Sequence, residues 1–181
     1  MRILSGRWGG RVIAQPATQS TRPLSEKVRA ALFDVVGSPE GLVVLDAYAG
    51  SGAAGLEALS RGALLVEAVE ANARVSRTII QNATQLSAGL THILHQMTLE
   101  TWLASPQQHP PSPRYGLMIA DPPYSHLDTD TLERLVPFLT SNGVLVLSHS
   151  SRLTTPALTG ATHLKTKIYG DTSLSFYRAS N

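Results

Sequence analysis

Short apolar runs alternate with amphipathic stretches from residue 42 to residue 148, and this alternation constrains the fold more than any other feature. The predicted strands are 42–47, 64–70, 92–95, 116–120 and 144–148. The predicted helices are 26–36, 53–61, 72–86, a short helix around 99–103, and 128–139. Repeated strand–helix units form a mostly parallel, doubly wound sheet with helices on both faces. The sequence therefore predicts an α/β fold.

Both ends of this pattern carry a predicted hairpin. Residues 2–14 form a short one, with three glycines near its turn, and residues 164–169 and 174–177 form another around Gly170 and Asp171. The second hairpin adds antiparallel strands to the sheet. We expect residues 1–181 to form one domain, divided into an N-terminal arm (1–24) and a core (25–181).

Basic residues are concentrated at the start of the chain, although the formal net charge of the 181 residues is only +2. The first 29 residues contain six basic side chains and one acid, Glu26. The basic residues are Arg2, Arg7, Arg11, Arg22, Lys27 and Arg29. A basic segment on a nearly neutral body is typical of an arm that binds a polyanion such as nucleic acid.

Composition also excludes several kinds of site. The chain has no cysteine, so disulfides, thiolate metal sites and cysteine nucleophiles are ruled out. It has no apolar run of the roughly 18 residues that a membrane span needs, and its first residues lack the apolar core of a secretion signal. We therefore expect a cytoplasmic monomer that has no membrane partner.

In a doubly wound sheet, ligands bind beyond the carboxyl ends of the strands, where the strand order reverses. After the first strand, Asp46, Ala47 and Tyr48 lead into Gly50-x-Gly52-x-x-Gly55, whose glycines allow a ligand to approach the backbone closely. The helix that follows points free N–H groups at the ligand. After the second strand, Glu70 is placed to accept hydrogen bonds from ribose hydroxyls.

The glycine pattern also matches the fingerprint of dinucleotide-binding proteins. In those proteins we expect the first glycine almost directly after the strand, whereas here residues 46–49 intervene. The Asp46 carboxylate repels a pyrophosphate but suits the ammonium group of an amino acid, whose carboxylate the helix N-terminus attracts. A nucleoside fused to an amino acid is S-adenosylmethionine, which we favour over NAD.

The third loop begins with Asp121, Pro122, Pro123 and Tyr124, directly after an apolar run. The two prolines fix the backbone and remove two N–H donors, so the carbonyls of Asp121 and Pro122 have no adjacent donor. Tyr124 adds an aromatic face. We predict that these four residues are the catalytic group and that they hold the exocyclic amine of a planar heterocycle. The alternative is a proline-rich loop in which Asp121 is only a turn residue.

Taken together, the segment 46–52, Glu70 and the segment 121–124 resemble the motifs of class I methyltransferases that act on exocyclic amines. Residues 3–11, 22–23 and 28–33 resemble the RsmD-type bacterial 16S rRNA guanine-N2 methyltransferases. The resemblance implies a Rossmann-like class I methyltransferase fold, S-adenosylmethionine as cofactor, no metal, and 16S rRNA or an assembling small ribosomal subunit as partner.

The resemblance also assigns binding residues. We predict cofactor contacts from Asp46, Ala47, Gly50, Ser51, Gly52, Glu70, Ala71, Gln96 and Met97, and RNA contacts from Arg2, Arg7, Trp8, Arg11, Arg22 and Arg29. Two positions depart from the family pattern. Gln96 and Met97 stand where the family usually has an acid or Asn that contacts adenine, and Asn72 replaces a second acid after Glu70.

An ionised aspartate only accepts hydrogen bonds, and guanine presents adjacent donors at N1 and N2, so the residues favour guanine. Two alternatives remain: an adenine-N6 methyltransferase acting on DNA or RNA, and an inactive nucleic-acid-binding module of the same fold. We interpret His92 and His95 as surface or filler positions. Ser148, His149 and Ser150 lack the nucleophile elbow that a catalytic triad needs.

Overall fold

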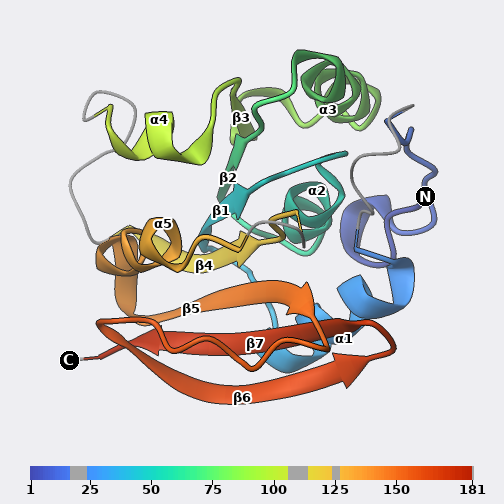
Figure 1. Ribbon diagram of the computed structural model, residues 1–181. Coiled ribbons are helices and arrows are strands. Elements are labelled where there is room, and N and C mark those ends of the chain that lie inside the picture. The colour runs from blue at the N-terminus through green and yellow to red at the C-terminus, as the bar shows by residue number, and fades with distance from the viewer. Residues whose placement is uncertain (17–23, 106–113, 124–126, 181) are drawn as a thin grey trace.

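The computed structural model describes residues 1–16, 24–105, 114–123 and 127–180, and its centre is a seven-stranded sheet (Figure 1). The strands are β1 (Val43–Ala47), β2 (Leu65–Val69), β3 (His92–His95), β4 (Tyr115–Ala120), β5 (Leu139–Ser150), β6 (Ala161–Tyr169) and β7 (Thr172–Ala179). Their spatial order is β3-β2-β1-β4-β5-β7-β6. The first five strands are parallel, whereas β7 is antiparallel to both of its neighbours. The predicted fold class is confirmed.

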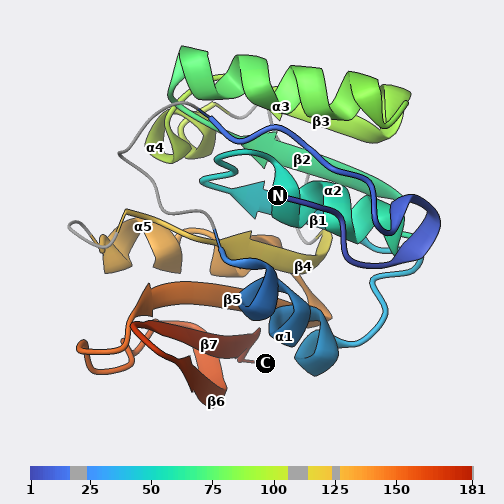
Figure 2. The same cartoon turned by 90° about the vertical axis from the view of Figure 1, so that its right-hand side faces the viewer.

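Helices cover both faces of the sheet (Figures 1 and 2). On one face lie α1 (Glu26–Val36), α2 (Ala53–Ser60) and α3 (Ala73–Gln85), and on the other α4 (Leu99–Leu103) and α5 (Thr129–Glu133). Successive strand residues point to opposite faces, so Val44 joins the core under α1 and α2 while Leu45 joins the core under α4 and α5. Among the helices of the described ranges, none is both long and apolar enough to cross a membrane.

The helix starts follow local sequence signals. Side chains of Ser25, Asn72, Thr98 and Asp128 accept hydrogen bonds from backbone N–H groups in the first turns of α1, α3, α4 and α5. Helix α2 differs from these, because its N-cap residue is Gly52, which has no side chain, and the only first-turn N–H with a side-chain acceptor in the described residues is that of Gly55, which donates to Asp46 of β1. Within the described residues, the N–H groups of Ala53 and Ala54 at the start of this helix have no side-chain acceptor.

The segment 128–139 is not the single helix that we predicted. Helix α5 ends at Glu133, a short 3-10 turn, η3, spans Val136–Phe138, and β5 begins at Leu139. Pro137 explains the break, because it has no N–H to donate to the carbonyl of Glu133. Strand β5 is correspondingly longer than the apolar run that predicted it.

The N-terminal arm is an irregular hairpin held against α2 and α3. An isolated bridge pairs Arg2 with Val12, and a 3-10 turn, η1 (Gly6–Trp8), replaces the expected tight turn. At Gly6, which has φ +79°, an added Cβ would lie 1.8 Å from the carbonyl oxygen of Ser60, so a side chain cannot fit there. The arm therefore lies flush against the end of α2 (Figure 2).

Buried polar side chains hold the arm in place. The Glu57 carboxylate of α2 accepts hydrogen bonds from Leu4 N–H at 2.7 Å and Ser5 N–H at 3.0 Å. The side chain of Asn82 in α3 accepts from Ala14 N–H at 2.8 Å and donates to the Ala14 carbonyl at 3.1 Å. The two halves of the arm also bond to each other, from Ile3 N–H to the Arg11 carbonyl and from Ile13 N–H to the Met1 carbonyl, so the helices and the hairpin together satisfy its backbone.

Candidate active site

The carboxyl ends of β1, β2 and β4 lie side by side (Figure 1). In the sheet register, Ala47 is level with Val69 of β2 and with Ala120 of β4. The three loops singled out in the sequence therefore begin at one edge of the sheet. Because β2 lies on one side of β1 and β4 on the other, this is the point where the strand order reverses and where such sheets bind ligands.

Asp46 lies at the base of the loop after β1 and is only 3% exposed. Its Oδ2 accepts a hydrogen bond from Gly55 N–H at 2.9 Å, and a Cβ added at Gly55 would lie 2.8 Å from Val66 Cγ1. Burial, opposed by the Gly55 hydrogen bond and assisted by the carboxylates of Asp121 and Glu70, raises the pKa of Asp46 to about 7. A nearby cation would stabilise the ionised form of this acid.

The glycine loop adopts the left-handed backbone that its sequence suggested. Gly50 has φ +56° and Gly52 has φ +74°, and Tyr48 also lies in this region with φ +64°. A non-glycine residue with such a φ is uncommon and is often found at functional sites. The buried Asn82 side chain donates to the Ser51 carbonyl at 3.0 Å and so ties this loop to α3.

Glu70, directly after β2, faces the same loop. Its Oε2 accepts from Gly50 N–H at 3.0 Å and its Oε1 accepts from Asn72 N–H at 2.8 Å. These bonds fix the carboxylate, and each oxygen has a further lone pair for a ligand hydroxyl. Ala71 beside it is exposed.

The end of β3 contains a buried ion-pair cluster that sequence reasoning missed. Glu67 in β2 is 3% exposed; its Oε2 lies 3.0 Å from His95 Nε2, and its Oε1 lies 2.9 Å from Arg114 Nη2. His95 is therefore a partner of a buried acid and not a filler residue. Gln96, which follows it, is exposed, and Met97 N–H donates to the His95 carbonyl at 3.0 Å. The sequence signal for this cluster was Glu67, an acid inside the apolar run 65–69, because a buried charge needs a partner.

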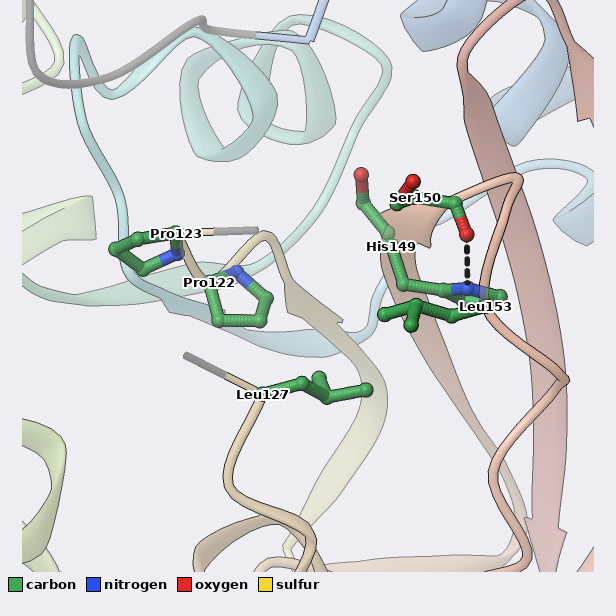
Figure 3. A pocket seen from close by; sticks show the side chains of 7 residues that line it. Pro122, Pro123, Leu127, His149, Ser150 and Leu153 are labelled. Atoms are coloured by element: carbon green, nitrogen blue, oxygen red, sulfur yellow. Dashed lines mark hydrogen bonds between the residues drawn. The ribbon is translucent and has the colours of Figure 1, made fainter. Parts of the chain in front are cut away.

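Asp121 is partly buried at the end of β4. Burial raises its pKa to about 6, against the effect of hydrogen bonds from the Ser148 hydroxyl and from Leu24 N–H. Ser148 is a supporting residue that sequence reasoning did not assign; its position at the end of the strand parallel to β4 was the signal. Pro122 is buried and Pro123 is exposed, and both line a hollow beside β5 (Figure 3). Tyr124 lies outside the described residues.

The structure corrects two of the predicted RNA contacts. Arg29 is fully buried: its Nε lies 3.6 Å from Glu57 Oε2, and its guanidinium donates to the Arg2 carbonyl. Trp8 is only 8% exposed and packs in the core beneath the Arg7 guanidinium. Neither side chain is accessible to RNA, because each one anchors the arm to the fold.

The other basic residues of the arm are accessible. Arg2, Arg7 and Arg11 are exposed, and Arg22 lies outside the described residues. Arg2 forms an exposed ion pair with Glu26 at 3.7 Å, and Arg11 donates to the Gln85 carbonyl at 2.9 Å. Residues 2–11 therefore carry three exposed guanidinium groups.

Within the described residues, no group of three or more histidine or acidic side chains is arranged to hold a metal ion. The acids at the sheet edge form a negative site next to a glycine loop and the start of α2. Such a site suits a small ligand that carries both a cation and a carboxylate.

Comparisons with known proteins agree with this geometry. Residues 1–178 match the family described as "Conserved hypothetical protein 95". The Escherichia coli K12 protein named ribosomal RNA small subunit methyltransferase D is 34% identical over 149 residues, which cover 80% of this chain and 69% of that protein. The Bacillus subtilis protein named "Putative rRNA methyltransferase YlbH" is 30% identical over 183 residues, covering 98% of both chains.

A solved structure supports the same relationship. "Putative methyltransferase yhhF" from Escherichia coli has a TM-score of 0.85 and 27% identity, covering 99% of this chain and 97% of that one. The chain therefore belongs to the conserved hypothetical protein 95 family, which is the RsmD family that its motifs resemble.

Proposed function

We propose that the protein transfers a methyl group from S-adenosylmethionine to the exocyclic N2 amine of a guanine in 16S rRNA of the small ribosomal subunit. The observation that carries this proposal is the position of Asp121, whose carboxylate lies at the sheet edge where the loops after β1 and β2 begin. Family membership supports RNA as the substrate, because the Escherichia coli relative is named a ribosomal RNA small subunit methyltransferase.

The residues after β1 and β2 fit S-adenosylmethionine. The left-handed glycines allow close approach, and the N–H groups of Ala53 and Ala54 at the start of α2 would hold the cofactor's carboxylate. Asp46 would hold the ammonium group, and Glu70 would accept hydrogen bonds from the ribose hydroxyls. When bound, the cofactor supplies an electrophilic methyl group. The other assigned cofactor contacts are Ala47, Ser51, Ala71, Gln96 and Met97.

Asp121 and Pro122 act on the amine that receives the methyl group. The N2 lone pair of guanine is delocalised into the ring, which makes it a poor nucleophile. The Asp121 carboxylate and the Pro122 carbonyl accept hydrogen bonds from the amine protons, which favours a pyramidal nitrogen with its lone pair aimed at the methyl group. The same acceptors stabilise the positive charge that develops on nitrogen, and alignment adds several kcal/mol.

RNA is held outside this acceptor pair. The exposed Arg2, Arg7 and Arg11 bind phosphates, and Arg22 is assigned the same role from the sequence. The target base reaches Asp121 only when it is single-stranded or flipped out of a helix. We assign Tyr124 to stacking on this base, an interaction worth about 1–3 kcal/mol.

The test is product analysis. The protein is incubated with radiolabelled S-adenosylmethionine and small-subunit particles that lack modifications, and the labelled nucleosides are identified. N2-methylguanosine supports the proposal, whereas N6-methyladenosine indicates the alternative adenine specificity. Unlabelled RNA refutes both and indicates an inactive binding module.

Asp121→Asn tests the role of the carboxylate, because it keeps the side-chain shape and removes the charge. We expect methyl transfer to fall at least about 100-fold, the scale of losing one electrostatic contact in a transition state, while cofactor binding stays near wild type. Loss of cofactor binding as well would show that Asp121 is structural.

The pH dependence gives a second measurement. Catalysis needs the ionised carboxylate, and the pKa of Asp121 is raised to about 6. Methyl transfer at saturating cofactor should therefore decline as pH falls through about 6. A rate that stays constant down to pH near 4, the ordinary pKa of an aspartate, would contradict this assignment.

A further inference from the structure

A small hollow lies directly beyond the acceptor pair. It is a shallow depression that encloses no ligand-sized space, with Pro122, Pro123 and Leu127 on one side and the end of β5 on the other (Figure 3). The opposite side consists of Ser148, His149, Ser150 and Leu153. Since Ser148 donates to Asp121, the hollow adjoins the proposed catalytic carboxylate.

The wall formed by residues 150–153 is held by its own hydrogen bonds. Leu153 N–H donates to the Ser150 carbonyl at 3.1 Å, and Arg152 N–H donates to Ser150 Oγ at 3.3 Å. Ser151 N–H donates to the Asp171 carbonyl at 2.9 Å, which ties the turn to the β6–β7 connection. The turn therefore has a defined shape before any ligand arrives, which lowers the ordering cost of binding.

The base of this wall is anchored inside the sheet. His149 is 2% exposed, and its Nε2 lies 2.8 Å from Ser175 Oγ of β7. Ser175 Oγ in turn lies 2.8 Å from Thr166 Oγ1 of β6. This buried network fixes the end of β5, from which the turn projects.

Leu153 presents an apolar surface in the hollow. Its side chain is 45% exposed, although its neighbours Pro122 and Ser148 are buried. An isolated exposed leucine is ordinary on a protein surface. Leu153 differs because it lines a concave site next to a catalytic carboxylate, where a flat apolar ligand face can cover it.

Arg152 gives the same turn a positive charge. It is exposed, and among the described residues it has no acidic partner within ion-pair distance. A base that lies over this shallow hollow brings its own phosphate to the rim, where a guanidinium binds phosphate oxygens in a two-pronged geometry. An apolar wall with a cation at its rim thus matches one nucleotide.

We infer that the turn Ser150–Leu153 is the second wall of the target-nucleotide site: Leu153 packs against the face of the extruded base, and Arg152 binds the adjoining phosphate. This inference rests on the proposed methyl transfer to an RNA base. It adds a contact surface on the side of the site opposite to Pro122 and Pro123, contributed by the connection from β5 to β6.

The first test compares Leu153→Ala with Leu164→Ala. Leu164 is a matched control, since it is 44% exposed but lies on β6, away from the hollow. Methyl transfer to small-subunit particles is measured as kcat/KM, together with the dissociation constant of S-adenosylmethionine. We expect kcat/KM to fall about 10-fold in Leu153→Ala, the scale of losing most of one apolar contact, with unchanged cofactor binding.

Leu164→Ala should match wild type, and Leu153→Met, which conserves volume, should restore most of the activity. The inference is overturned if the unchanged protein methylates RNA and Leu153→Ala does so equally well. If the unchanged protein labels no RNA, the proposed function is refuted, and this inference with it. This result differs from equal labelling by the unchanged protein and Leu153→Ala, which refutes the inference alone.

The second test measures the salt dependence of RNA binding for Arg152→Gln. Loss of one phosphate contact should reduce the slope of log K against log salt by about 1. Arg178→Gln is the control, since Arg178 is exposed but pairs with Val144 in the middle of β5, whereas the turn follows Ser150 at its end. An unchanged slope in Arg152→Gln refutes the phosphate contact.

Discussion

The buried carboxyl group of Asp46 is expected to lower the free energy of unfolding when it ionises. We propose the same residue as a cofactor contact. Its pKa in the folded state is raised from 3.8 to about 7. The unfolded chain therefore releases this proton at lower pH than the folded chain does, and stability is lost as pH rises between the two values. One pKa unit corresponds to about 1.4 kcal/mol, so the loss attributable to Asp46 between pH 5 and pH 8 is about 2–3 kcal/mol.

Asp46→Asn removes this titration while its amide oxygen can still accept the hydrogen bond from Gly55 N–H. Urea unfolding without cofactor should show that the stability of the variant relative to wild type grows by about 2–3 kcal/mol from pH 5 to pH 8. Titrating groups outside this site affect both proteins equally and cancel in this difference. Asp34→Asn, which removes an exposed carboxylate of α1, is the control for the loss of a surface charge.

The same variant should bind S-adenosylmethionine more weakly by calorimetry, because the ammonium group loses its charged partner. Stability would thus be gained at the expense of binding, as is common for residues of functional sites. A stability difference that is independent of pH would refute the reasoning, since it would show that Asp46 carries no buried charge at pH 8.

Three further predictions concern the arm and the cofactor loop. Glu57→Ala leaves the buried Arg29 without its partner and should lower the free energy of unfolding by about 3–5 kcal/mol, measured by urea denaturation; a change below 1 kcal/mol would contradict the anchoring role. Glu70→Ala should weaken cofactor binding by about 1–3 kcal/mol in calorimetry, and an unchanged dissociation constant would remove Glu70 from the site. Replacing Arg7 and Arg11 with Gln should weaken RNA binding and flatten its salt slope by about one unit per lost phosphate contact, whereas an unchanged slope would identify them as ordinary surface residues.

Sequence patterns predicted the parallel part of the fold because β1, β2 and β4 are mostly buried and read as apolar runs. They also located the acids at the sheet edge, since Asp46, Glu70 and Asp121 each follow such a run directly. The structure adds the register that brings Ala47, Val69 and Ala120 level, and this register places the three loops together.

The features that sequence reasoning missed depend on contacts between distant segments. Arg29 has the charge of an RNA contact, but its helix position turns it toward Glu57, which only tertiary packing reveals. The hydrophobic period of residues 128–139 suited a helix, but Pro137 ends it and β5 extends back to Leu139 to pair with Tyr115. Pairing partners and backbone breaks outweighed local propensity at these positions.

The placement of β7 has a consequence for how the chain is made. β7 lies between β5 and β6 although it follows both in the sequence. While the ribosome is still synthesising it, β6 has no strand to pair with and the backbone edge of β5 is open. An open edge beside an apolar strand invites pairing with other nascent chains. Insertion of β7 therefore closes the sheet late, and chaperone protection matters most during that interval.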